Sequence, residues 1–261
     1  MKSKFFRGLI LISVAAMLLS GTTVNASTVK KNSYVGEKKG ITIEYFGHSS
    51  FGISDSEGMK IVTDPYDPIM GYTFPSVSTQ IVTISHNHFD HNYLLYENLL
   101  YKQLYFSTTG SFEYEGIKIE GIPSWHDNEQ GALRGSNTIY TYEINNIKVC
   151  HLGDLGHQLS KEQLKSIGKV DVLMIPVGGN FTIDSAEAVQ VINSINPKVI
   201  IPMHYSTDIS YLKDYLAPLD DFIDKAKLEG WDIENVDKLS LTNQMLDIMK
   251  TKKVFVLNYN H

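Results

Sequence analysis

The feature that most constrains this chain of 261 residues is a dense run of imidazoles with one carboxylate, Ser85-His86-Asn87-His88-Phe89-Asp90-His91-Asn92. Residues 80–85, which lead into it, are rich in β-branched side chains and predict a buried strand. Because residues two apart on a strand point the same way, His86 and His88 can bind one ion. After the chain turns, Asp90 and His91 can face a second ion, and such ligands suit zinc, manganese or iron. A polar loop with chance histidines is the alternative, which the ligand density at a strand end disfavours.

Three residues elsewhere in the chain can complete a centre for two ions. His126, Asp154 and His204 each come shortly after an apolar segment that predicts a strand. A single histidine is more often a satisfied structural group than a ligand. Three such residues at strand ends, in a chain that already carries the His86 run, favour ligation instead.

The rest of the chain predicts many strands and few helices. Predicted strands span 41–46, 50–54, 60–63, 80–85, 117–122, 138–144, 147–152, 170–176, 199–202 and 253–258, the last as an edge strand. Predicted helices span 93–101, 184–195, which opens with a capping box, and 219–228. Prolines and a glycine make 64–78 a loop. This order predicts two packed sheets with helices outside and chemistry at the strand ends.

At these residues the chain resembles the metallo-β-lactamase superfamily of metal-dependent hydrolases, over about 41–207. Its appearance is closest to the branch that includes ascorbate-6-phosphate lactonase. The segments that carry this likeness are Gly47-His-Ser-Ser-Phe51, Thr63-Asp-Pro65, Gly153-Asp154, Pro176-Val-Gly-Gly179 with Phe181-Thr182, and Pro202-Met-His-Tyr205. The resemblance implies an α/β fold, the αββα sandwich of two mixed sheets flanked by helices, with the site at one edge. Asn92-Tyr93 depart from the branch, which has Leu-Asp there.

The resemblance also implies the ligands of two divalent ions, zinc first and manganese as the alternative. Its ligand sets are His86, His88 and His126 for one ion, and Asp90, His91 and His204 for the other, with Asp154 bridging them. Two such ions lower the pKa of a shared water from about 15.7 towards ~7, so the bridging hydroxide would be the nucleophile. Asp90 is the catalytic candidate, because it would also orient this hydroxide.

Several neighbouring residues have two interpretations each. Asp64 is either a hydrogen-bond acceptor for a ligand imidazole or a turn cap before Pro65. His48 lies either at the site mouth or behind the ligands, or it makes a structural hydrogen bond. His157 either binds substrate or bonds to the backbone. Cys150, the only cysteine, is expected to be a buried and unreactive thiol.

The amino terminus predicts export. Lys2, Lys4 and Arg7 precede an apolar run at 9–19 that is too short to span a bilayer, and cleavage is expected after Ala26. An uncleaved anchor is the alternative. The expected organisation is a signal peptide at 1–26, a lead-in segment at 27–40 and one hydrolase domain at 41–261, secreted or extracytoplasmic without a stable membrane anchor.

The formal net charge of the chain narrows the classes of substrate that we expect. Residues 1–26 carry three positive charges and no negative ones, so cleavage lowers the formal charge from −6 to −9. Such an acidic surface disfavours nucleic acid, and a small-molecule substrate is expected. No sequence feature indicates an oligomeric state.

The sequence therefore predicts a hydrolase of small esters, lactones or phosphoesters. One alternative is a phosphodiesterase or nuclease on the same centre. The other is a non-catalytic secreted protein that binds metal or ligand. A true zinc β-lactamase is disfavoured, because its commonest kind has cysteine where Asp154 stands.

Overall fold

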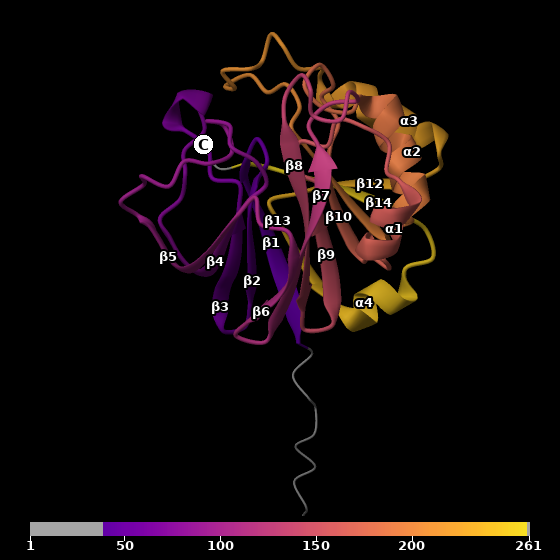
Figure 1. Ribbon diagram of the computed structural model, residues 1–261. Helices are drawn as coiled ribbons and strands as arrows, with labels where there is room; N and C mark the ends of the chain where they lie inside the picture. Colours follow the sequence, from indigo (N-terminus) through magenta and orange to yellow (C-terminus); the bar gives the residue numbers. More distant parts are fainter. Residues whose placement is uncertain (1–38, 260–261) are drawn as a thin grey trace, which may run out of the picture. The chain divides into compact units, whose positions relative to one another are not determined.

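A computed structural model describes residues 39–259, in which two mixed sheets pack face to face (Figure 1). The first sheet has six strands in the order β13 (Lys238–Thr242), β1 (Gly40–Gly47), β2 (Ser50–Asp55), β3 (Gly58–Thr63), β4 (Val77–Ile84) and β5 (Leu99–Phe106). The second has eight strands in the order β12 (Asp232–Val236), β14 (Lys253–Leu257), β11 (Val199–Met203), β10 (Val172–Pro176), β9 (Ile147–His151), β8 (Ser136–Ile144), β7 (Ile117–Trp125) and β6 (Gly110–Tyr114).

Helices cover the outer face of the eight-stranded sheet. They are α1 (Lys161–Ile167), α2 (Ser185–Ile195) and α3 (Leu219–Leu228), while α4 (Asn243–Ile248) follows β13 (Figure 1). On the six-stranded sheet, loop residues provide the cover instead: Met70, from the 3-10 helix η1 (Pro68–Met70), and Leu212 pack with Phe46 and Val62. The predicted sandwich of two mixed sheets is confirmed, and its helices gather mainly on one sheet.

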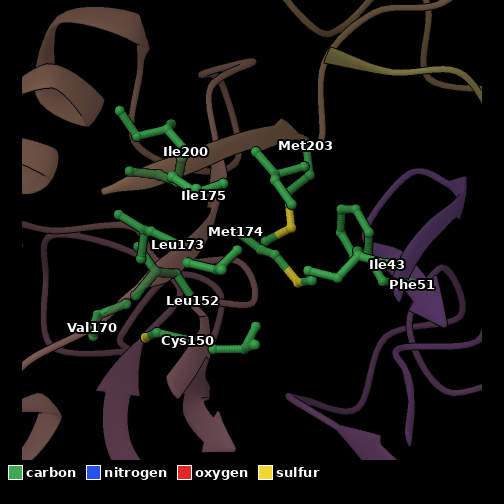
Figure 2. Close-up of a cluster of buried hydrophobic side chains, with 14 of the residues drawn as sticks. Ile43, Phe51, Cys150, Leu152, Val170, Leu173, Met174, Ile175, Ile200 and Met203 are labelled. Atoms are coloured by element: carbon green, nitrogen blue, oxygen red, sulfur yellow. The ribbon is translucent and has the colours of Figure 1, made fainter. Parts of the chain in front are cut away.

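The two sheets share one apolar core. Ile43 of β1 and Phe51 of β2 meet Met174 of β10 and Met203 of β11 between the sheets (Figure 2). Full burial of such a side chain stabilises the fold by about 1.5–3 kcal/mol. This core fixes the sheets against one another, and with them the strand ends that carry the site.

Two predictions of secondary structure were wrong. Residues 93–101 do not form a helix: β5 starts at Leu99 and pairs in parallel with β4 along its length, which satisfies the main chain better than an isolated helical turn. The strand predicted at 253–258 is β14, but it is not an edge strand, because β12 pairs with its outer side. Strands β5, β6, β12 and β13 and helices α1 and α4 were not predicted.

Strand direction explains why the site lies at one edge. In the first sheet β1 and β3 are both antiparallel to β2, and β4 is parallel to β3, so all three run the same way. In the second, β7 and β9 are both antiparallel to β8, and β10 and β11 continue parallel to β9. The carboxyl ends of these strands therefore gather at one edge of each sheet.

The predicted signal peptide at 1–26 and residues 27–38 of the predicted lead-in segment lie outside the described residues. Across 39–259, no helix is both long enough and apolar enough to cross a membrane.

Candidate metal centre

Every candidate residue of the centre follows the carboxyl end of a strand. His48 follows β1, Asp64 follows β3, the run His86, His88, Asp90 and His91 follows β4, His126 follows β7, Asp154 follows β9, and His204 follows β11. Apart from half-buried His88, all these side chains are buried. The common edge of the sandwich thus collects side chains that lie up to 156 positions apart, from His48 to His204.

The first group of ligand atoms comes from His86, His88 and His126, which lie within 4.8 Å of one another. The Nε2 atom of His86 is 3.0 Å from Nδ1 of His88. The ring of His126 lies 4.7 Å from that of His86 and 5.0 Å from that of His88, between centroids. These are the three residues that the resemblance assigned to one ion.

The second group comprises Asp90, His91 and His204, together with His48. His48 was expected only near the site, yet its Nε2 lies 3.1 Å from Oδ2 of Asp90 and its ring 4.3 Å from that of His204. The carbonyl oxygen of His48 also accepts a hydrogen bond from the His204 amide, at 2.9 Å. His48 therefore belongs to the geometry of this group, as a fourth possible ligand or as the partner of Asp90.

Asp154 lies between the two groups. Its Oδ2 is 3.1 Å from Nε2 of both His91 and His204 and 3.2 Å from Nε2 of His126. The same oxygen is 3.8 Å from Nε2 of His86. One carboxylate thus faces imidazoles of both groups, which is the placement that a bridging ligand needs.

Asp64 acts on the far side of a ligand. Its Oδ2 accepts hydrogen bonds from Nδ1 of His91 at 2.9 Å and from Oγ of Ser85 at 2.6 Å. Its Oδ1 accepts from the Ser85 amide at 2.7 Å. Because Nδ1 of His91 is engaged this way, Nε2 is the nitrogen that faces the centre. Burial acts to lower the pKa of His91, but Asp154 and Asp90 outweigh it and raise the pKa well above 6.5, so a metal ion would bind Nε2 in place of a proton.

His157 and His151 do not reach the centre. Nε2 of His157 accepts from the Trp125 amide at 3.1 Å, and Nδ1 donates to the Gln158 carbonyl at 2.8 Å. His151 donates from Nε2 to the Ser49 carbonyl at 2.8 Å. Both histidines bond to the backbone, so His157 shows the structural one of its two interpretations.

The residues fit divalent metal ions. Buried Nε2 atoms of His91 and His204 and Oδ1 of Asp154 have no hydrogen-bond partner within the described chain. A buried polar atom left unpaired costs about 1–3 kcal/mol, and a cation between these atoms would satisfy them together. Imidazole nitrogen with carboxylate oxygen suits zinc, manganese or iron.

Burial and neighbouring charges together set the protonation states of these side chains. Burial lowers the pKa of His86 to well below 6.5, and the neighbouring His91 lowers it further, so the neutral, ligating imidazole is favoured. For Asp154, burial acts to raise the pKa, but His204 and His91 outweigh it and hold the pKa well below its ordinary value. The bridge position is therefore occupied by a carboxylate.

Three of these residues have left-handed backbones. The φ angles of His48, Asp64 and His204 are 55°, 38° and 52°. Residues other than glycine are uncommon there, and such conformations gather at functional sites. Asp64 and His48 share this left-handed conformation with His204. The amino-acid sequence alone does not predict it at these positions.

A two-sheet sandwich with a His/Asp centre at the carboxyl edge of its strands defines a metallo-β-lactamase-type protein. The chain belongs to this superfamily: the family described as "Beta-lactamase superfamily domain" matches residues 42–204. Within it the chain is similar to the UPF0173 metal-dependent hydrolases. The one from Thermococcus onnurineus is 26% identical over 193 residues, 64% of this chain and 85% of the relative. The one from Alkaliphilus metalliredigens is 31% identical over 195 residues, 63% and 85% of the two chains.

A solved structure agrees with this placement. The crystal structure from Thermotoga maritima, assigned to the Zn-dependent hydrolases of the metallo-beta-lactamase superfamily, is 37% identical with a TM-score of 0.67. The match covers 84% of this chain and 100% of that one. The superfamily predicted from the sequence is confirmed.

Proposed function

We propose that this protein is a dinuclear metal-dependent hydrolase that cleaves small esters, lactones or phosphoesters. The observation that carries the proposal is Asp154, whose Oδ2 lies 3.1–3.8 Å from imidazole nitrogens of both ligand groups. The descriptions of the UPF0173 relatives as metal-dependent hydrolases support it. The lactone class follows the likeness to the lactonase branch.

Two ions would be held by the proposed ligand sets: His86, His88 and His126 for one, Asp90, His91 and His204 for the other, and Asp154 for both. Zinc is the proposed metal and manganese the alternative. Divalent ions here supply Lewis acidity, which acidifies water and polarises a carbonyl or phosphoryl oxygen.

The other side chains position this machinery. Asp64 holds the His91 ring through Nδ1, and Ser85 holds Asp64 through two hydrogen bonds. Asp90 accepts from His48 at Oδ2 and is proposed to orient the attacking water as a hydrogen-bond acceptor. Burial, aided by the charge of His204, lowers the pKa of His48 to about 4 and outweighs the effect of Asp90, so His48 acts as a neutral imidazole.

The proposal is tested by measuring hydrolysis and its loss when the metal or Asp154 is removed. The purified, zinc-loaded protein should hydrolyse members of a panel of lactones, carboxylic esters and phosphodiesters, and a chelator should abolish this. Asp154→Ala should remove the activity, whereas Asp247→Ala, which removes an exposed carboxylate on α4, should leave it unchanged. A metal-loaded protein inactive on all three classes would contradict the proposal and favour a non-catalytic binding protein. Cleavage of polymeric nucleic acid alone would favour the nuclease alternative.

Export is part of the same proposal. The basic and apolar start of the chain supports a signal peptide cleaved after Ala26, which would place the enzyme outside the cytoplasm with small molecules as substrates. Sequencing the amino terminus of the native protein should find Ser27 first. An intact Met1 in the membrane fraction would show that the segment is an anchor.

A further inference from the structure

The loop 127–135, directly after His126, is held in one conformation by a single carboxylate. Asp127 accepts hydrogen bonds from the amides of Glu129, Gly131, Leu133 and Arg134, at 2.9, 2.7, 3.0 and 2.7 Å. The carbonyl of the following residue, Gly135, accepts from the His126 amide at 3.0 Å. The loop is therefore closed back onto a proposed metal ligand, and Arg134 lies near its end.

Arg134 reaches across to a second segment of the site. Its guanidinium lies 5.5 Å from the ring centroid of Phe181, which is half-buried. Phe181 sits in the segment 178–183, where Gly178 packs on the His204 carbonyl so closely that a Cβ would meet that oxygen at 2.2 Å. The Ile183 amide donates to the Leu155 carbonyl at 2.9 Å, one residue after Asp154. The Arg134–Phe181 pair thus joins segments attached to His126, His204 and Asp154.

The guanidinium of Arg134 has no acidic partner. Among residues 39–259, no carboxylate lies within 4.0 Å of it, and it makes no side-chain hydrogen bond. The carboxylate nearest in the chain, Asp127, is already occupied by four amides. Arg134 is the only arginine of the described residues, since the other one in the sequence is Arg7. A half-buried guanidinium that is positioned on an aromatic face keeps its donors available for an oxyanion.

We infer that Arg134 recognises an anionic group of the substrate, a carboxylate or a phosphate, beside the bond that is cleaved. This inference rests on the proposed function and narrows it from small esters in general to anionic ones. Arginine binds such groups through two parallel hydrogen bonds, and the cation–π contact with Phe181 restrains the guanidinium. In a chain with a formal charge of −6, a fixed cation at the site is what an anionic substrate needs.

A matched pair of esters tests the inference. 4-Nitrophenyl hydrogen glutarate and 4-nitrophenyl pentanoate have acyl chains of the same length and differ in a terminal carboxylate or methyl group. In the zinc-loaded protein, Arg134→Gln should lower kcat/KM for the glutarate ester by about tenfold or more, mainly through KM, because a charge-assisted contact is lost. It should leave the pentanoate ester almost unchanged, and Arg134→Lys should restore part of the loss.

The controls separate recognition from folding and from net charge. Lys102→Gln removes one exposed positive charge on β5 without touching the site, and it should alter neither ester. Equal loss on both esters in Arg134→Gln, or no loss on either, would overturn the inference while leaving the hydrolase proposal intact.

If the protein cleaves neither ester, the inference is tested by measuring the binding of related small molecules. Isothermal titration with monomethyl glutarate and with methyl pentanoate should then show a preference for the anion that disappears in Arg134→Gln. That result would uphold anion recognition even if hydrolysis fails. Absence of any preference would contradict it.

Discussion

Nδ1 of His91 donates to the Asp64 carboxylate at 2.9 Å, while Nε2 of the same ring lies 3.1 Å from Asp154. One imidazole thus connects a carboxylate behind the centre to the carboxylate inside it. The contact leaves Nε2 as the nitrogen that can bind a metal, in exchange for its proton. It also shows that Asp64, which follows a strand of the first sheet, supports a ligand that follows the neighbouring strand.

Replacement of this carboxylate should weaken metal binding. In Asp64→Asn, an amide NH2 must face either the Ser85 amide, now 2.7 Å from Oδ1, or the Ser85 and His91 donors at Oδ2. We expect a loss of about 10–100-fold in metal affinity at the second group, as for other residues that orient ligand histidines. Competition with a calibrated chelator measures it. Unchanged affinity would mean that the Asp64–His91 contact does not support binding.

The two ligand groups should lose metal separately. His126→Ala removes a ligand of the first group only, and His204→Ala one of the second only. Each variant is expected to retain one ion where the wild type retains two, as measured by metal analysis of the purified proteins. Wild-type protein that binds a single ion at saturation would show that the groups form one site.

His48 can be assigned by the same measurement. If His48 is only a partner of Asp90, His48→Gln should preserve the ion count, because an amide can still donate to Oδ2. Turnover should fall, because His48 holds Asp90, which is proposed to orient the attacking water. Loss of one ion from His48→Gln would make His48 a ligand of the second group.

Asn137 positions the bridging carboxylate, and its loss should be costly. Its Oδ1 accepts from the Asp154 amide at 3.0 Å, and its Nδ2 donates to the Leu152 carbonyl at 2.9 Å and to Ser124 at 2.8 Å. Asn137→Leu would remove these partners of the Asp154 amide and the Leu152 carbonyl, at about 1–3 kcal/mol for each buried group left unpaired, while Ser124 would keep its bond to the carbonyl of residue 137. Thermal unfolding should show a lower Tm, both with and without metal. An unchanged Tm would mean that water replaces the amide.

Cys150 should be unreactive in the native protein. Burial raises the pKa of its thiol from its ordinary value of 9 to about 12. Iodoacetamide at pH 8 should therefore leave Cys150 unmodified until the protein is unfolded, which mass spectrometry can follow. Because the folded pKa is the higher one, the thiol's contribution to stability is complete below pH 9 and is lost as the pH rises towards 12. Rapid native alkylation would show that β9 opens.

Local sequence was enough to find the outline of the centre. The spacing of histidines and aspartate from His86 to His91 indicates metal binding. The apolar segments ahead of His126, Asp154 and His204 indicate that these residues follow strands. Helices α2 and α3 were also predictable, because a capping box and helical periodicity are local signals. Residues 93–101 were not, because pairing with β4 decides their conformation.

The sequence by itself determined which side chains can bind metal and that they follow strands. Only the tertiary structure decided which of them meet. It brought His48 to Asp90, turned Asp64 towards His91, kept His157 on the backbone and laid Arg134 over Phe181. These contacts join residues 27 to 47 positions apart, through the packing of two sheets and the common direction of their strands. Periodicity and propensity act over a few residues, so no local pattern encodes such meetings.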